Sequence, residues 1–291
     1  MLKIRSFAKI NLALSVLGRR LDGYHDIQTI FQTVDLSDEL EFSDSAQLDL
    51  HCEDFPDIRP EENLVWRAAT LLSSAVDKKS GAAVTLKKRI PAGAGLGGGS
   101  GDAAATLLGL RRFWNLKVPD SDLLSLAEKL GSDVPFFLSG GTALGTGRGE
   151  KINPLPDSPR RHLVIIFPGI HVSTAEAYRS LNLGLTSSEE DHRIQHFIGQ
   201  VQAGRSYLTG IFNDFEASVL TAYPPVMEAK RFLEQRGATA TLLSGSGSSV
   251  FGFFSSEESA FAASRNVPRE AWRVFPAKTL SRAEYFQNMF G

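Results

Sequence analysis

The 291-residue sequence has little cysteine: Cys52 is the only one. A single cysteine forms no intramolecular disulfide and supplies no thiolate metal cluster, so neither is expected to hold the chain together. This usage fits a reducing cytoplasm. With 42% hydrophobic residues, the chain can bury a substantial core without such cross-links.

Long hydrophobic runs and an excess of positive charge are also missing. No stretch approaches the roughly 18 apolar residues of a membrane span. The first residues, MLKIRSFAKINLAL, lack a basic segment followed by an apolar core. A formal net charge of -2 argues against a surface that neutralises many nucleic-acid phosphates. We therefore expect a cytoplasmic protein whose partners include neither a nucleic acid polymer nor a membrane.

Hydrophobic periodicity predicts strands and helices in mixed order. Alternating apolar residues predict strands over residues 2–16, 40–42, 48–50 and 83–90, with a buried strand at 162–168. Helical spacing predicts helices over residues 63–79, 102–114, 121–130, 174–181, 226–236 and 255–265. Glycine and proline are dense between residues 140 and 159, which predicts a domain boundary near residue 155. The sequence thus predicts an α+β protein with domains at 1–155 and 156–291.

The most distinctive stretch is PAGAGLGGGSGDAAATL, residues 91–107, which links a predicted strand to a predicted helix. A helix N-terminus exposes unpaired N–H groups and carries the positive end of the helix dipole. Glycines before it allow the backbone to approach an anion closely. We therefore interpret residues 91–101 as a phosphate-binding loop, with a ligand-free flexible connection as the alternative.

Two other glycine-loop interpretations fit less well. Gly93, Gly95 and Gly98 spell G-x-G-x-x-G, but the loop opens on Pro91 and lacks the acidic residue that the Rossmann pattern expects about 20 positions on. The P-loop requires Gly-Lys-Ser/Thr, which is absent. A second cluster, Ser244–Ser249, is by itself more typical of a tight connection between strands than of a ligand contact.

The loop sequence resembles the second motif of the GHMP kinases, the superfamily of galactokinase, homoserine kinase and mevalonate kinase. AKINLALSVLGRRLDGYHDIQTIFQTVDLSDEL resembles, more specifically, the family of kinases that act on 4-diphosphocytidyl-2-C-methyl-D-erythritol. So do NLVWRAA, LGSDVPFFLSGG, VSTAEAY, NDFE and LSGSGSSVFG, in the family's order from residue 8 to residue 252. The resemblance implies a two-domain GHMP kinase fold, with a ribosomal protein S5 domain 2-like N-terminal domain and a ferredoxin-like C-terminal domain.

The resemblance also implies an ATP-dependent kinase that phosphorylates the 2-hydroxyl of this substrate in non-mevalonate isoprenoid biosynthesis. By likeness to the family's motifs, Lys9 and Asp133 are the catalytic residues. Asp133 would accept or steer the proton of the alcohol, and Lys9 would keep that carboxylate ionised. Without the resemblance neither residue stands out, since Lys9 is one of 31 basic residues and Asp133 suits an ordinary turn.

The family likeness assigns five residues to the substrate. Tyr24 would stack on the cytosine and His25 would bond its edge, as aromatic and polar side chains do with single-stranded bases. Tyr178 would cover the opposite face of the base, with Thr174 nearby. Asn11, two positions from Lys9 on the same strand face, would bond the substrate. The alternatives are a surface turn for Tyr24 and His25, a helical core aromatic for Tyr178, and a strand-edge polar residue for Asn11.

On the nucleotide side, the likeness places Asn63 and Lys88 around adenine. The triphosphate would lie on Pro91, Ala92, Gly93, Ala94, Gly95, Leu96, Gly97, Gly98, Gly99, Ser100 and Gly101. Asn63 also suits a helix cap, and Lys88 a solvated strand face. The family usually has serine where this chain has Gly101, so a hydroxyl contact is expected to be lost while the backbone cradle survives. Mg²⁺ is implied by ATP chemistry, with no protein ligand assigned and no metal centre expected.

Rival functions remain open at this point. A mevalonate- or homoserine-type kinase would not need DGYH and Tyr178, because its substrate has no base to stack. A non-catalytic nucleotide or sugar sensor would not need both Lys9 and Asp133. A nicotinamide-dependent oxidoreductase would have to bind that cofactor on the G-x-G-x-x-G. We expect a monomer or a weak homodimer.

Overall fold

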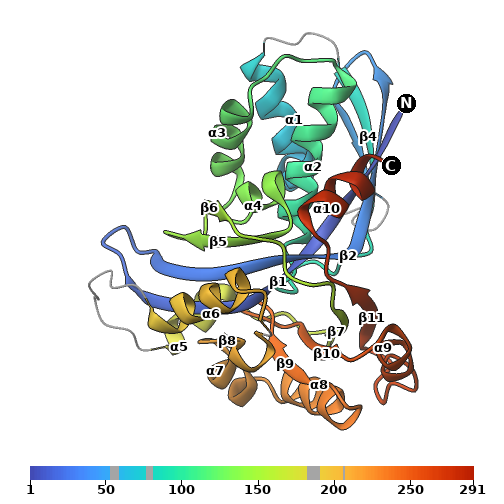
Figure 1. Cartoon of the computed structure of the whole chain (residues 1–291). Coiled ribbons are helices and arrows are strands. Elements are labelled where there is room, and N and C mark those ends of the chain that lie inside the picture. The colour runs from blue at the N-terminus through green and yellow to red at the C-terminus, as the bar shows by residue number, and fades with distance from the viewer. Residues whose placement is uncertain (53–58, 77–80, 182–190, 206) are drawn as a thin grey trace.

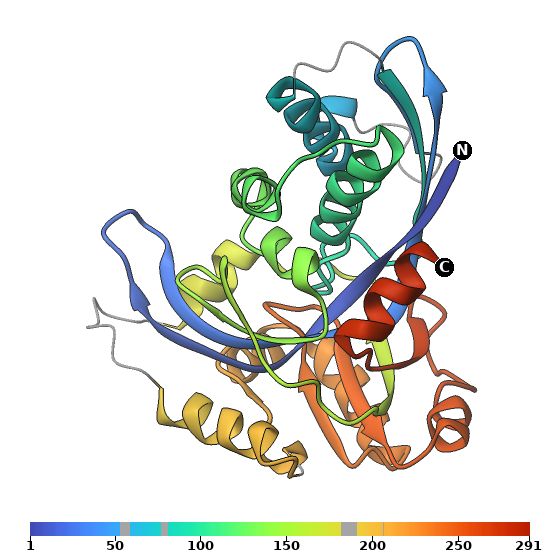
Figure 2. The same ribbon diagram turned by 45° about the horizontal axis from the view of Figure 1, so that its top comes forward.

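The computed structural model describes residues 1–52, 59–76, 81–181, 191–205 and 207–291. Two β-sheets form the framework, one in the upper and middle part of Figure 1 and one in the lower part. The chain builds the upper part first, passes to the lower part, and returns at its C-terminus, as Figure 2 also shows. The order of strands and helices is mixed, as the hydrophobic pattern predicts.

The first sheet is built on one long antiparallel hairpin. Its strands run in the order β3-β4-β2-β1-β8, with β5 also paired to β2 and β6 paired to β5. The bounds are β1 (Leu2–Arg19), β2 (His25–Ser45), β3 (Asp49–His51), β4 (Gly81–Lys87), β5 (Thr142–Thr146), β6 (Lys151–Pro154) and β8 (Phe212–Asn213). Irregularities in the β1–β2 register fall between Phe7 and Ala8, between Asn11 and Ala13, and between Val16 and Gly18. Such bulges re-aim the side chains beside them, here those of Lys9 and Asn11.

Helices pack on this sheet around a continuous apolar core. They are α1 (Leu64–Ala75), α2 (Gly98–Phe113), α3 (Asp120–Leu130) and α4 (Val134–Ser139), preceded by a 3-10 turn at Pro60–Glu62. The centre is α2, whose Ala103, Ala104 and Ala105 are fully buried. A Cβ at Gly109 would lie 2.7 Å from the Phe42 ring. Small residues therefore bring α2 close to the strands and fix its N-terminus firmly.

The second sheet has the order β11-β7-β10-β9 and is antiparallel. Its strands are β7 (His162–Phe167), β9 (Ala240–Leu243), β10 (Val250–Phe254) and β11 (Arg273–Lys278). The helices of this part are α5 (Thr174–Ser180), α6 (His192–Gln202), α7 (Glu216–Ala222), α8 (Pro224–Gln235) and α9 (Glu257–Ala263), with a 3-10 turn at Leu208–Gly210. Its strands are apolar on both faces because helices cover one side and the first sheet approaches the other.

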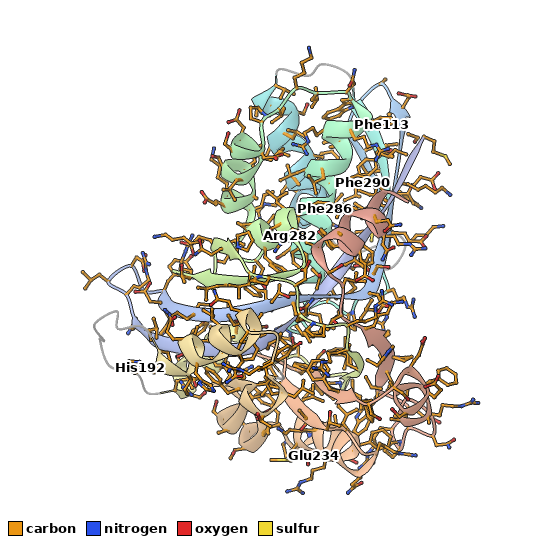
Figure 3. All side chains as sticks on the ribbon, viewed as in Figure 1. Phe113, His192, Glu234, Arg282, Phe286 and Phe290 are labelled. Carbon is orange, nitrogen blue, oxygen red and sulfur yellow. The ribbon has the colours of Figure 1, made fainter. Side chains whose placement is uncertain are left out.

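Two late segments join the second part to the first. Strand β8 pairs in parallel with β1 at Ala13 and Leu14. Helix α10 (Arg282–Phe290) returns to pack on β1, where the Tyr285 ring lies 5.6 Å from that of Phe7. Figure 3 shows Phe286 and Phe290 on this returning helix. The C-terminal 80 residues thus contribute directly to the N-terminal sheet and its core.

Most predicted elements are present, but some boundaries differ. Helix α2 begins at Gly98, four residues before the predicted start, because packing outweighs the poor helix propensity of glycine. Strand β4 ends at Lys87 because the Asp38 carboxylate accepts the N–H groups of Arg89 and Ile90. The predicted helix over 63–79 is observed at Leu64–Ala75, and its residues 77–79 lie outside the described chain.

Candidate active site

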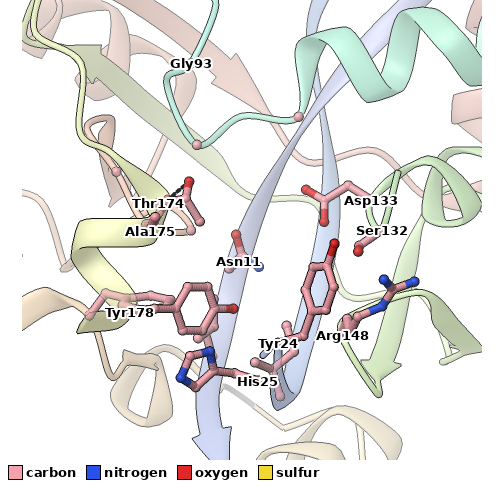
Figure 4. A pocket seen from close by; sticks show the side chains of 18 of the residues that line it. Asn11, Tyr24, His25, Gly93, Ser132, Asp133, Arg148, Thr174, Ala175 and Tyr178 are labelled. Carbon is pink, nitrogen blue, oxygen red and sulfur yellow. Dashed lines mark hydrogen bonds between the residues drawn. The ribbon is translucent and has the colours of Figure 1, made fainter. Parts of the chain in front are cut away.

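A cavity of about 990 Å³ opens between the two parts of the molecule (Figure 4). It is bounded by β1, the β1–β2 turn, the glycine loop before α2, the turn before α4, helix α5 and the second glycine cluster. Of the candidate site residues it is lined by Lys9, Asn11, Tyr24, His25, Gly93, Gly95, Gly97, Asp133, Thr174 and Tyr178. Both predicted catalytic residues and all five predicted substrate residues therefore face one space.

The loop before α2 alternates between glycines that face the cavity and apolar residues that anchor it. Gly93, Gly95 and Gly97 line the cavity, all with positive φ, whereas Ala94 and Leu96 are 2% and 1% exposed. The next residue, Gly98, begins the 16-residue helix α2. The cavity therefore meets flexible backbone and the amide end of a helix together, the arrangement that binds anions.

Hydrogen bonds from the surrounding protein fix this loop through its carbonyl groups. The Leu96 oxygen accepts from the backbone N–H of Lys9 at 2.9 Å. The Ala94 and Gly95 oxygens accept from Ser249 N and Ser244 Oγ at 3.1 and 2.9 Å. Three successive carbonyl groups of the loop therefore accept hydrogen bonds, one from β1 and two from the second glycine cluster. These bonds fix the loop conformation from both parts of the molecule.

Two of the loop glycines permit no side chain. A Cβ at Gly95 would lie 2.1 Å from the carbonyl oxygen of Ser244. At Gly97 it would lie 2.9 Å from the Phe137 ring and 3.1 Å from Lys9 Cγ. Positive φ disfavours any other residue at both positions as well. Close packing therefore requires these two glycines, whether or not a ligand binds the loop.

Lys9 and Asp133 meet at the wall formed by β1. Lys9 Nζ donates to Asn11 Oδ1 at 2.7 Å and lies 3.4 Å from Asp133 Oδ2. The Lys9 side chain is 5% exposed and that of Asp133 32%. Asn11 is held in turn by a 2.8 Å hydrogen bond to Thr29. A buried ammonium group is thus paired and oriented, while its carboxylate partner still faces the cavity.

Asp133 is available for chemistry because its local structure does not use its side chain. It precedes α4 at the capping position, but its carboxylate makes no capping hydrogen bond. Pro135 in the first turn of α4 fixes the backbone there. In Figure 4 the Asp133 carboxylate points toward the space between the aromatic residues and the glycine loop.

Aromatic side chains form the opposite end of the cavity. The His25 ring stacks on Tyr178 with centroids 4.4 Å apart, and Tyr178 meets the Phe215 ring edge-on at 4.8 Å. Tyr24 is 55% exposed, and the Arg148 guanidinium lies 4.8 Å from its ring centroid. Thr174 Oγ1 lies 2.9 Å from Ser246 Oγ. Figure 4 shows Tyr24 and Tyr178 on two sides of one open space.

Burial affects the ionisation of two of these groups. Burial lowers the pKa of His25, with a further decrease from the charge of Arg19, so its ring is neutral at pH 7. A neutral imidazole offers one donor and one acceptor to a ligand. Burial, with the charge of Asp133, raises the pKa of Tyr178 to about 12, so Tyr178 remains a neutral hydroxyl.

The two residues expected around adenine have structural contacts. Asn63 caps α1 by accepting the N–H of Val65 at 2.9 Å. Lys88 is mostly buried, and its Nζ contacts the carboxylates of Asp38 and, at 2.6 Å, Asp102. Burial raises the pKa of Asp102, against the opposing charge of Lys88. Lys88 is therefore not on a solvated strand face, and neither residue lines the cavity; their contact with adenine stays a prediction.

The position where the family has serine faces away from the cavity. Gly101 is buried in α2, and a Cβ there would lie 2.8 Å from the Phe7 carbonyl oxygen and 2.9 Å from Ser6 Oγ. A serine side chain at this position would therefore point toward β1, where the Ser6 hydroxyl already lies. The glycine departs from the family pattern without altering the cavity wall.

Two family models match the chain: the GHMP kinases N terminal domain at residues 63–141 and the GHMP kinases C terminal domain at residues 202–274. The 4-diphosphocytidyl-2-C-methyl-D-erythritol kinase of Solibacter usitatus is 44% identical over 265 residues, covering 89% of this chain and 83% of that protein. The chain belongs to this kinase family. The enzyme of the same name from Pelotomaculum thermopropionicum is 42% identical, covering 94% and 96% of the two chains.

Solved structures agree with this family assignment. A crystal structure of 4-(cytidine 5'-diphospho)-2C-methyl-D-erythritol kinase matches with a TM-score of 0.80 and 34% identity, covering 96% of this chain and 99% of that one. A homoserine kinase from Cytophaga hutchinsonii matches with a TM-score of 0.69 at 18% identity, over 96% and 95% of the two chains, and shows the shared fold alone. The α+β GHMP kinase fold implied by the sequence is confirmed.

The structure adds residues to this kinase site that the sequence analysis did not assign to it. Gly245, Ser246 and Gly247 line the cavity, although their cluster by itself predicts a tight connection. The G-x-G spacing of Gly245 and Gly247, between two strands, was the sequence signal that could have indicated their place in the site. Arg19, Arg148 and Arg179 also line the cavity, and these scattered cations carry no local signal. Among the described lining residues Asp133 is the single acid, so the cavity favours polyanionic ligands.

In the described ranges, no group of three or more His, Cys, Asp or Glu residues could hold a metal ion. No helix in the same ranges is both long and apolar enough to cross a membrane.

Proposed function

We propose that this protein transfers the terminal phosphoryl group of ATP to the 2-hydroxyl of 4-diphosphocytidyl-2-C-methyl-D-erythritol, in non-mevalonate isoprenoid biosynthesis. The observation that carries the proposal is the meeting of Lys9 and Asp133, 3.4 Å apart, between a glycine loop and an aromatic pocket. The curated relatives at 38–44% identity bear the name of this kinase, which supports the same substrate.

The donor side of the cavity fits a triphosphate. The backbone at Gly93, Gly95 and Gly97 can be approached without an intervening side chain, and α2 directs its unpaired amides toward the same place. Helix α2 has 16 residues and no acidic residue in its first turn, so its positive end is not neutralised locally. Asn63 and Lys88 would lie on the adenine side of this loop.

The acceptor side supplies the proton chemistry. Asp133 would accept the proton of the alcohol as the new oxygen–phosphorus bond forms and the bond from the terminal phosphorus to the departing ADP breaks. Lys9 would balance the negative charge that develops. Asn11 holds Lys9 Nζ at 2.7 Å and keeps it directed toward Asp133. The chemistry relies on positioning and charge, which is what phosphoryl transfer mainly requires.

The aromatic end would recognise the cytidyl group. Tyr24 and Tyr178 would bracket the base, and the neutral His25 ring would bond its edge. Thr174 would contact the substrate beside them. A substrate without a base would leave this end of the cavity unfilled, which disfavours mevalonate and homoserine as substrates.

Magnesium would bind with ATP rather than at a protein metal centre. When bound, Mg²⁺ neutralises phosphate charge. We assign it no protein ligand.

A coupled ADP-release assay on the purified protein tests the proposed function. It would compare 4-diphosphocytidyl-2-C-methyl-D-erythritol, mevalonate and homoserine, each with ATP and Mg²⁺. We expect turnover with the first alone. Turnover with mevalonate or homoserine in its place would assign the protein to another GHMP activity, and ATP binding without any turnover would favour a sensor.

A further inference from the structure

Asn213 is a buried residue of the NDFE segment that makes three hydrogen bonds through its side chain. It ends β8 beside β1 and is 7% exposed. Its Nδ2 group donates to the carbonyl oxygens of Leu243 and Gly245 at 2.9 and 2.7 Å, and its Oδ1 accepts the N–H of Phe215 at 3.0 Å. Because two partners are acceptors and the third is a donor, only one orientation of the amide satisfies all three.

Through its Nδ2 group, Asn213 is connected to the phosphate-binding loop, residues 91–101. Gly245 belongs to the second glycine loop, Ser244–Ser249, whose residues 245–247 line the cavity. Ser244 Oγ donates to the carbonyl of Gly95, and Ser249 N donates to that of Ala94. A displacement of the second glycine loop would therefore move the loop that receives the triphosphate.

The Oδ1 side of Asn213 leads to the aromatic end of the cavity. It fixes the backbone of Phe215, whose ring is 1% exposed and meets Tyr178 edge-on at 4.8 Å. Tyr178 stacks on His25. The position of one amide thus determines the support beneath the proposed base-binding ring.

We propose that Asn213 is a positioning residue that keeps the phosphate loop and the base-binding aromatic residues in register across the cavity. It does not line the cavity, so it acts through Gly245 and Phe215 rather than on the ligands. The inference rests on the proposed function, because the two ends it links are those assigned to ATP and the cytidyl group.

A matched control distinguishes positioning from simple structural support. Gln32 is a buried amide, 1% exposed, whose Nε2 donates to the carbonyls of Thr33 and Leu280 at 3.0 and 2.8 Å. Its Oε1 accepts from Thr142 at 2.7 Å, and Gln32 lies outside the cavity lining. Asn213→Asp and Gln32→Glu therefore make the same chemical change, but only the Asn213 side chain bonds residues that line the cavity, Gly245 and Phe215.

The experiment measures kcat, both KM values and thermal stability for the two variants. Each substitution places a carboxylate against two carbonyl oxygens, and the loss of both hydrogen bonds should lower Tm in both variants. In the folded fraction, Asn213→Asp should lower kcat by about 10²-fold, the effect of a misplacement of roughly 1 Å, and Gln32→Glu should stay within about twofold of wild type. A protonated carboxyl can donate to one carbonyl, so the relative kcat of Asn213→Asp should rise as pH falls.

Folded Asn213→Asp with near wild-type kcat would overturn the proposal, as would an equal loss in Gln32→Glu. If Asn213→Asp does not fold, Ser244→Ala serves instead, since it removes the hydrogen bond to Gly95 without adding an atom. It should lower kcat/KM for ATP by about tenfold or more, and an unchanged value would equally overturn the proposal.

Calorimetric titration with a non-hydrolysable ATP analogue separates this proposal from the proposed function. Weaker binding by Asn213→Asp, or by Ser244→Ala in its place, than by Gln32→Glu supports the positioning role even if the wild type turns over no cytidyl substrate. Equal binding by both variants contradicts it. Failure of the wild type to turn over the substrate counts against the proposed function alone.

Discussion

Single residues in this kinase carry functions that depend on their partners. Lys9 Nζ is buried and tolerates burial because Asn11 and Asp133 lie within 2.7 and 3.4 Å. Asp133 in turn remains accessible because it makes no capping bond to α4. The pair is therefore held by packing on one side and open to the cavity on the other.

Asp133→Asn should lower kcat by about 10²-fold or more, because an amide cannot accept the proton of the alcohol. Its KM for either substrate should change little, whereas Tm should fall, because the buried Lys9 ammonium loses its carboxylate partner. Steady-state kinetics and a thermal melt test this. Asp120→Asn, at an exposed carboxylate paired with Arg111, is the control. A folded Asp133→Asn variant with wild-type kcat would refute the assignment.

Tyr24→Ala should raise KM for the cytidyl substrate by about tenfold, because stacking on a base contributes roughly 1–3 kcal/mol. KM for ATP should stay constant, and Tyr24→Phe should retain most of the affinity because it keeps the ring. Measurement of both KM values tests the location of the base pocket. An unchanged KM for the cytidyl substrate in Tyr24→Ala would show that the pocket is misplaced.

For single residues, local sequence signals were weak wherever tertiary contacts determine which side chains meet. Lys9 and Asp133 are 124 positions apart, and only the family resemblance indicated that they meet. The alternating strand did predict that Lys9 and Asn11 share a face, and their hydrogen bond agrees. The burial of Lys88 against Asp38 and Asp102 had no local signal, because both carboxylates come from other elements.

Whole elements position the site through their ends. The glycine loop is anchored by Ala94 and Leu96 in the core and presents its glycines to the cavity. The sequence predicted the order strand, loop, helix, but placed the start of α2 four residues late. Glycine propensity argued against a helix there, and the packing of α2 on β1 outweighs it.

Gly95→Ala should reduce kcat/KM for ATP by about 10²-fold, because its Cβ would force the loop away from Ser244. Gly237→Ala is the matched control: it also has positive φ, but a Cβ there meets nothing within 4 Å. It should cost only about 1–2 kcal/mol of stability through backbone strain and leave kcat/KM unchanged. Equal kinetics for the two variants would contradict the close-packing argument.

Helix α6 is attached to β1 by charged groups, and its attachment should depend on pH. Burial tends to raise the pKa of Asp191, but hydrogen bonds from Arg193 and Ser15 outweigh it and lower the pKa to about 2, from an ordinary 3.8. A lowered carboxyl pKa contributes stability above 3.8 that is lost as pH falls toward 2. Denaturant melts should show that the free energy of unfolding falls less over this pH range in Asp191→Asn than in the wild type. Parallel losses would contradict this contribution.

The whole molecule forms its site from both parts. Gly93–Gly97, Lys9 and Asp133 come from the first part, and Thr174, Tyr178 and the second glycine loop from the other. Parallel pairing of β8 with β1 and the return of α10 to the first sheet hold these parts together. Composition and periodicity predicted an α+β chain, but the return of α10 required long-range packing that no local pattern shows.

The proposed reaction depends on where the triphosphate binds and what its terminal phosphorus faces. A crystal structure with a non-hydrolysable ATP analogue and the cytidyl substrate tests it most directly. We expect the phosphates on the backbone of residues 93–101, with the terminal phosphorus facing a substrate hydroxyl beside Lys9 and Asp133. A triphosphate bound elsewhere, or a substrate hydroxyl remote from this pair, would contradict it.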